Sequence, residues 1–84
     1  MAKYKCPCCG YYTLNDKPGT FDICPVCYWE DDNIQRIKPD YEGGANRVSL
    51  NQARSNYKKI GAIEQEHLVS VRNPLNDELS ENNN

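Results

Sequence analysis

Two C-x-x-C pairs in the first third of the chain constrain its fold more than any other feature. The first pair is Cys6 and Cys9, the second is Cys24 and Cys27, and fourteen residues separate Cys9 from Cys24. Two residues between a pair of thiolates allow a tight turn to direct both sulfurs at one ion, and two such turns supply the four ligands of a tetrahedral site. The sequence therefore predicts one metal ion bound by these four cysteines.

Each C-x-x-C turn, called a knuckle below, carries further turn signals. Proline follows the first cysteine of each pair, where it presets φ for the turn. Gly10 follows the first knuckle and permits the positive φ that closes it, whereas Tyr28 follows the second knuckle. Because a tyrosine at positive φ is strained, we expect the second knuckle to close less tightly.

The composition indicates that the cysteines are needed to hold the fold together. The chain has 84 residues, enough for one domain, and Leu, Ile, Val and Phe together account for only 15 of them. A chain this short and this poor in aliphatic side chains rarely folds on a hydrophobic core alone. Its charged fraction of 26% is too low for disorder by composition. A bound metal is the expected source of the missing stability.

We expect no targeting segment at the N-terminus, and this expectation bears on whether the cysteines are reduced or oxidised. No apolar run in the sequence is long enough to span a membrane. We therefore expect a cytoplasmic protein without membrane association, in which thiols stay reduced and clustered cysteines bind metal. The odd number of cysteines, five, also fits poorly with a closed set of disulfides.

The four-cysteine set favours Zn²⁺, with iron as the alternative, because tetrahedral sulfur sites serve both metals. With every coordination position filled by protein, no open position remains for activated water or a polarised substrate. The metal is therefore expected to be structural, or an electron carrier if it is iron. We expect no enzymatic activity.

Three further features each admit a plain interpretation and a more specific one. The fifth thiol, Cys8, is interpreted as a small residue beside the site, with an alternative ligand or a redox-reactive thiol left open. The acidic run 29–32 is interpreted as a solvated loop whose Trp29 covers the metal, although it could be a docking patch for a basic partner or begin a helix over 32–36. His67, the single histidine, is expected at the surface rather than among the ligands.

Local signals predict a short strand on each side of a turn, and one clear helix. The runs 11–14 and 20–23 flank the turn at 17–19, so we expect a hairpin that brings the two knuckles together. A helix over 49–61 has Ser49 as its N-cap, a capping box completed by Gln52, and Gly61 at its end. One face of this helix should cover the knuckles; it consists of Leu50, Ala53, Tyr57 and Ile60. A shorter helix is expected over 64–69, and 76–84 should form a disordered tail after a single domain at 1–75.

The knuckles resemble those of two families. Lys3 to Tyr11, together with Ile23 to Cys27, is similar to the knuckles of rubredoxins and rubredoxin-like zinc ribbons, although the intervening loop is shorter and Tyr28 replaces a glycine. A closer resemblance is to the cysteine-rich CPCC family of small bacterial proteins. It is carried by the segments 6–10, 21–27, 29–32, 44–50 and 71–74. The resemblance implies a bacterial zinc-ribbon-like protein and says little about activity.

Together these observations predict a small α+β domain held together by a metal ion, with a zinc-ribbon or rubredoxin-like β-hairpin core and a C-terminal helix packed on it. The expected function is that of a non-catalytic binding or adaptor module for a protein partner that the sequence does not identify. A rubredoxin-like iron electron carrier is the first alternative, and a nucleic-acid-binding zinc ribbon is the second. The net charge of −2 and the pI of about 5.3 argue against nucleic acid.

Overall fold

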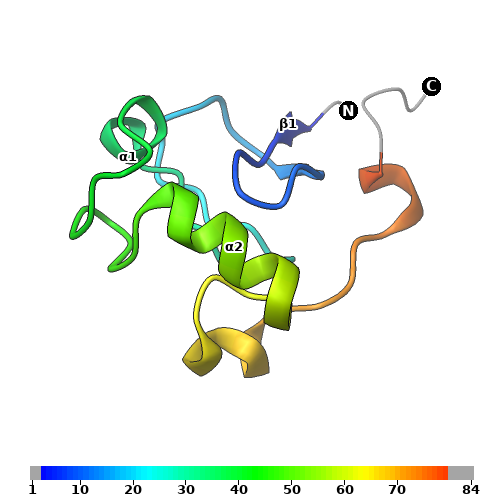
Figure 1. Cartoon of the computed structure of the whole chain (residues 1–84). Helices are drawn as coiled ribbons and strands as arrows, with labels where there is room; N and C mark the ends of the chain where they lie inside the picture. Colours follow the sequence, from blue (N-terminus) through cyan, green and yellow to red (C-terminus); the bar gives the residue numbers. More distant parts are fainter. Residues whose placement is uncertain (1–2, 80–84) are drawn as a thin grey trace.

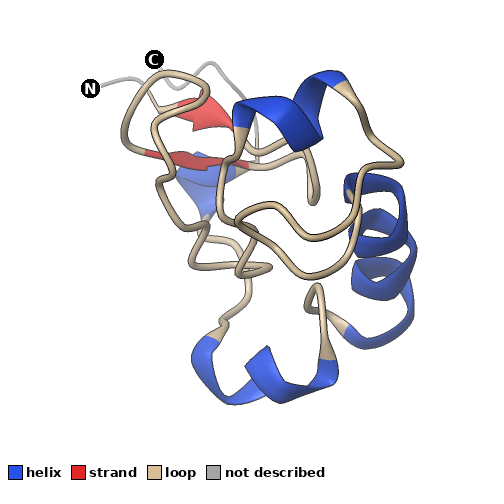
Figure 2. Ribbon diagram, turned by 90° about the vertical axis from the view of Figure 1, so that its left-hand side faces the viewer, coloured by secondary structure: helices blue, strands red, loops and turns tan. Residues whose placement is uncertain are grey.

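A computed structural model describes residues 3–79 of the chain (Figure 1). Loops make up most of it, around two short strands and a few helices (Figure 2). The regular elements are β1 (Tyr4–Lys5), β2 (Tyr12–Leu14), α1 (Asn33–Ile37), α2 (Leu50–Ile60) and two 3₁₀ helices, η1 (Gln65–Ser70) and η2 (Asn76–Glu78). Among these helices, none is both long and apolar enough to cross a membrane.

Each knuckle lies between two segments that pair with each other. Strand β1 runs antiparallel to β2, with Tyr4 opposite Leu14, so the first knuckle is the loop of this hairpin. Ile23 and Glu30 form an antiparallel bridge on either side of the second knuckle. The predicted hairpin between 11–14 and 20–23 is therefore wrong. The knuckle itself reverses the chain, and this local closure brings the segment before it against the segment after it.

Helix α1 begins directly after its N-cap residue, Asp32. The carboxylate of Asp32 accepts hydrogen bonds from the backbone N–H groups of Ile34 and Gln35, which satisfies donors that the first helical turn leaves free. The helix over 32–36, which the sequence left open as an alternative, is present as α1. The solvated-loop interpretation of the acidic run is wrong for Asp31 and Asp32, which are both buried.

Helix α2 has the boundaries that the sequence predicts. The hydroxyl of Ser49 accepts from the backbone N–H of Gln52 at 3.1 Å, and Gly61 ends the helix in the left-handed conformation at φ 90°. The predicted capping box is only half formed. The side chain of Gln52 donates to Asn56 and makes no hydrogen bond back to the backbone of Ser49. Along the predicted apolar face, the side chains become less buried toward the C-terminal end: Leu50 and Ala53 are buried, Tyr57 packs at the edge of the core, and Ile60 is 43% exposed.

A buried amide pair organises the loop between α1 and α2. The side chain of Gln35 is fully buried, and its Nε2 donates to the backbone carbonyls of Tyr41, Asn46 and Val48. Its Oε1 accepts from both the backbone N–H and the side-chain Nδ2 of Asn46. This loop therefore has a fixed conformation that places Ser49 at the start of α2.

The C-terminal segment contains the shorter helix expected over 64–69. It is a 3₁₀ helix at residues 65–70, without buried side chains. Residues 76–79 belong to the folded domain, because η2 contacts β2 and Glu78 is buried with its carboxylate 4.0 Å from Lys3 Nζ. The predicted boundary at residue 75 is therefore too early. Residues 80–84 of the predicted tail lie outside the described residues.

Candidate metal centre

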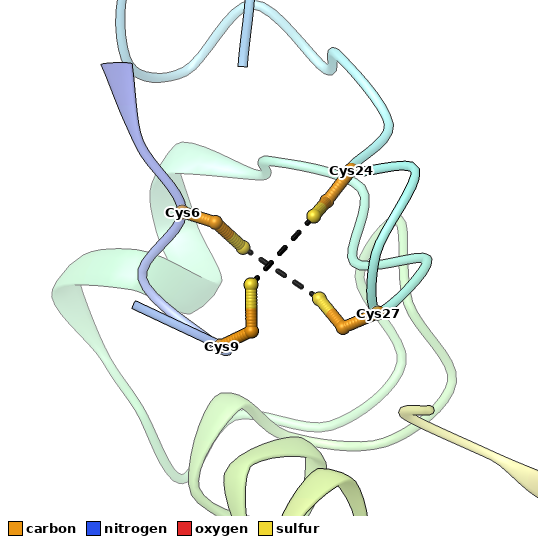
Figure 3. Close-up of side chains that lie close together, drawn as sticks. All are labelled: Cys6, Cys9, Cys24 and Cys27. Atoms are coloured by element: carbon orange, nitrogen blue, oxygen red, sulfur yellow. Dashed lines mark hydrogen bonds between the residues drawn. The ribbon is translucent and has the colours of Figure 1, made fainter. Parts of the chain in front are cut away.

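The four cysteines of the two knuckles point toward one another at a single place (Figure 3). Cys6 Sγ lies 3.6 Å from Cys27 Sγ, and Cys9 Sγ lies 3.8 Å from Cys24 Sγ. The ligand atoms of all four lie within 4.8 Å of one another. A tetrahedron of sulfurs about 2.3 Å from a central Zn²⁺ has S···S edges of about 3.8 Å. The four sulfurs therefore have the spacing that a tetrahedral metal site requires.

The cysteine cluster forms part of the hydrophobic core. Cys6, Cys24 and Cys27 are completely buried, whereas Cys9 is partly exposed. The other buried apolar residues in the same cluster are Cys8, Leu14, Val26, Trp29, Leu50, Ala53 and Ile63. Trp29 is fully buried in this cluster, so it is not part of a solvated loop. A metal at this point would therefore be surrounded by the core itself.

Both knuckles close with the same backbone hydrogen bond. Gly10 N donates to Cys6 O at 2.9 Å, and Tyr28 N donates to Cys24 O at 2.8 Å. Tyr28 adopts the positive φ of 75°, close to the 84° of Gly10. The expectation of a looser second knuckle is therefore wrong. The Tyr28 ring stacks on His67 with centroids 4.3 Å apart, a contact that helps to hold Tyr28 in this strained conformation.

Hydrogen bonds distinguish Cys24 from the other three cysteines. Thr13 Oγ1 lies 2.9 Å from Cys24 Sγ, and the backbone N–H of Val26 donates to the same sulfur at 3.4 Å. Thr13 is buried on β2. The sequence analysis missed this residue, and the only available signal was its place in the strand that follows the first knuckle.

The electrostatics of the four thiols favour a cation. Hydrogen bonds from Cys27, Cys6 and Cys9, and a smaller one from Thr13, lower the pKa of Cys24 against the opposing effect of burial. The pKa values of the other three thiols are raised, chiefly by their hydrogen bonds with Cys24. A divalent cation would displace the protons of these thiols, since thiolates are the metal ligands.

The second half of the chain holds both knuckles in place from outside. Arg54 Nε on α2 donates to the carbonyl of Pro7 at 2.9 Å in the first knuckle. In the second knuckle, the carbonyl of Cys27 accepts from Ile63 N at 3.0 Å, and that of Pro25 accepts from Arg72 N at 3.1 Å. Folding of the C-terminal half and assembly of the cysteine cluster are therefore coupled.

The fifth thiol lies beside the cluster. Cys8 is 8% exposed and packs in the core. Its closeness to Cys27 contributes to the raised pKa of that thiol. This placement agrees with a small buried residue next to the site.

A second group of possible ligands, Glu64, Glu66 and His67, gathers near the second knuckle. Arg47 Nη2 lies 2.8 Å from the carboxylate of Glu64 and 3.1 Å from that of Glu66. Both acids raise the pKa of Arg47, through a hydrogen bond to Glu64 above all. The guanidinium therefore already neutralises part of the negative charge of this group. His67 is partly exposed and lies apart from the four cysteines.

Comparison with known proteins identifies the family. The model of the cysteine-rich CPCC family matches residues 4–78, so the chain belongs to this family. Reverse rubrerythrin-1 of Clostridium acetobutylicum is 36% identical over 61 residues, which cover 71% of this chain and 32% of that protein. The chain thus spans about a third of the length of this relative.

Proposed function

We propose that this protein is a small non-catalytic binding module built around a structural Zn²⁺ held by Cys6, Cys9, Cys24 and Cys27. The observation that carries the proposal is the position of the four sulfurs, which have tetrahedral spacing inside the core. Four thiolates complete the coordination of Zn²⁺, so the ion would stabilise the fold instead of presenting an open position to a substrate.

Exposed apolar side chains support a protein as the partner. Ile34 and Ile37 lie one turn apart on α1 and are 56% and 69% exposed, and Tyr41 after the helix is 46% exposed. Apolar side chains at i and i+3 lie on the same face of a helix, a pattern that partner proteins recognise. Since Asp31 and Asp32 are engaged inside the fold, we propose an apolar contact here in place of the acidic docking patch.

An iron electron carrier is the second candidate. Two observations favour it: the similarity to reverse rubrerythrin-1, and the partial exposure of Cys9, which gives a bound metal one side close to solvent. The S···S distances suit iron as well as zinc, because tetrahedral sulfur sites serve both metals. A nucleic-acid-binding role has less support, because Arg47 is already paired with two carboxylates.

Metal content and colour distinguish these functions. We would purify the full chain without added metal, measure zinc and iron per chain, and record the visible spectrum. One zinc per chain, no colour, and loss of cooperative unfolding when a chelator removes the metal would support the structural site. One iron per chain with thiolate charge-transfer bands would favour the electron carrier. A chain that folds cooperatively without any metal would contradict both.

A further inference from the structure

We propose that Thr13 is a positioning residue for the bound metal: its hydroxyl donates a hydrogen bond to the Cys24 sulfur, which fixes the place of this ligand and lowers the electron density that it gives to the metal. The inference rests on the proposed metal site. It assigns to Thr13 a role that lies outside the set of four ligands.

The geometry that carries this inference is a short contact without solvent access. Thr13 Oγ1 and Cys24 Sγ are 2.9 Å apart, and the two residues are 1% and 0% exposed. Thr13 belongs to β2, whose pairing with β1 across the first knuckle fixes its backbone. Thr13 and Cys24 therefore lie on segments that flank different knuckles, and their contact joins the two.

The direction of the hydrogen bond follows from the state of the sulfur. A metal-bound cysteine is a thiolate and carries no proton, so it can only accept. The hydroxyl of Thr13 must then donate, alongside the weaker donor Val26 N at 3.4 Å. Hydrogen bonds to a charged acceptor are stronger than those between neutral groups, and they stabilise the charged form of the acceptor.

Two measurable consequences follow for a loaded site. A thiolate that is stabilised by a hydroxyl gives up less of its electron density to the metal, so its charge-transfer bands lie at higher energy. The same hydrogen bond holds the sulfur in the place that the metal requires, so it strengthens metal binding. Loss of a residue that orients or hydrogen-bonds a ligand typically weakens metal binding about 10- to 100-fold.

The test compares three variants of the full chain. Thr13→Val removes the hydroxyl with little change in shape, and Thr13→Ser restores it. Thr20→Val is the matched control, because the Thr20 hydroxyl donates to Lys17 O at 2.9 Å in an exposed turn away from the sulfurs. For each protein, Zn²⁺ affinity is measured by competition with a chromophoric chelator at one neutral pH. The charge-transfer bands are measured with Co²⁺.

We expect Thr13→Val to bind Zn²⁺ about 10- to 100-fold more weakly than the unmodified chain. Its Co²⁺ bands should move to longer wavelength, and Thr13→Ser and Thr20→Val should match the unmodified chain. A purely structural role for Thr13 would weaken binding and leave the bands in place, which would overturn the inference. So would a Thr13→Ser variant that behaves like Thr13→Val. If the unmodified chain itself bound neither metal, the proposed site would fail, a result that is distinct from these.

Discussion

The side-chain amide of Asn46 pairs with both backbone polar groups of Glu30. Asn46 Nδ2 donates to Glu30 O at 2.7 Å, and Asn46 Oδ1 accepts from Glu30 N at 2.9 Å. A neighbouring strand would make these two hydrogen bonds to Glu30, and here the amide makes them, next to the Ile23–Glu30 bridge that closes the second knuckle. Since the same Nδ2 also donates to Gln35, one side chain connects the second knuckle to the loop that leads into α2.

Replacement of Asn46 should therefore cost more stability than a surface change. Asn46→Ala removes the three hydrogen bonds of this side-chain amide and leaves Glu30 N without an acceptor, and we expect a loss of about 2–4 kcal/mol in the free energy of unfolding. The measurement is denaturant unfolding of the metal-loaded protein at fixed free metal. Asn51→Ala is the matched control: its amide bonds Asp40 at the surface, so the expected cost is below about 0.5 kcal/mol. Equal costs for the two variants would contradict the role of Asn46.

Gly44 is required by close packing in the same loop. A Cβ at this position would lie 2.7 Å from Asp32 Oδ2 and 2.9 Å from Gln35 Cδ. We expect Gly44→Ala to destabilise the protein by about 1–3 kcal/mol, because the N-cap of α1 and the buried amide must both shift.

The neighbouring glycine provides the comparison. Gly43 has φ +82° with open space around it, and asparagine tolerates this conformation. Gly43→Asn should therefore change the midpoint of denaturant unfolding little. If Gly44→Ala were as stable as the unmodified chain in this assay, the contact of Gly44 with Asp32 would not constrain the loop.

The sequence predicts features that depend on hydrogen bonds between near neighbours. The knuckles and the caps of α2 involve groups at most four residues apart, as in the bond from Gly61 N to Tyr57 O. For such features the residue type and its spacing are sufficient information. This is why the C-x-x-C turns and the bounds of α2 agree with the structure. The clustering of the four cysteines joins residues 15 and 21 apart, and it was predictable because one tetrahedral ion needs both pairs.

Features that depend on distant partners could not be predicted in this way. The sequence places Asp32 in an acidic run that is expected in solvent. In the structure its carboxylate accepts a hydrogen bond from Ala45 N, thirteen residues away. Gln35 and Asn46 read as ordinary polar residues, because nothing local shows that an amide is buried. The hairpin was misassigned for the same reason, since strand-like runs at 11–14 and 20–23 do not reveal their partners.

The five cysteines should not be equivalent. Cys24→Ser removes the thiol with the lowered pKa, and we expect it to lose bound metal and cooperative unfolding. Binding of structural zinc contributes about 10–16 kcal/mol in small domains, which is comparable to the whole stability of a fold. Cys8→Ser should keep one metal per chain. Metal content and circular dichroism during thermal unfolding measure both effects. A Cys8→Ser variant without metal would make Cys8 a ligand.

The ion pair between Arg72 and Glu78 should stabilise the fold at neutral pH, and this stabilisation should be lost at acidic pH. Arg72 Nη1 and Nη2 donate to the two carboxylate oxygens of Glu78 at 2.8 and 2.9 Å, and Leu75 N donates to one of them at 2.8 Å. The hydrogen bonds from Arg72 above all lower the pKa of Glu78, against the effect of burial.

A carboxyl whose pKa is lower in the folded state stabilises the fold at pH values above its unfolded pKa, which is about 4.3 for glutamate. This stability is lost as the pH falls through that value toward the folded pKa. We expect Glu78→Gln to cost about 1–2 kcal/mol at pH 7, since Arg72 is partly exposed, and the difference from the unmodified chain should shrink below about pH 4. Denaturant unfolding at a series of pH values measures this difference. Glu42→Gln, at an exposed loop position, is the control for a general charge effect. A Glu78→Gln cost that is the same at every pH would show that the residue stabilises the segment by packing alone.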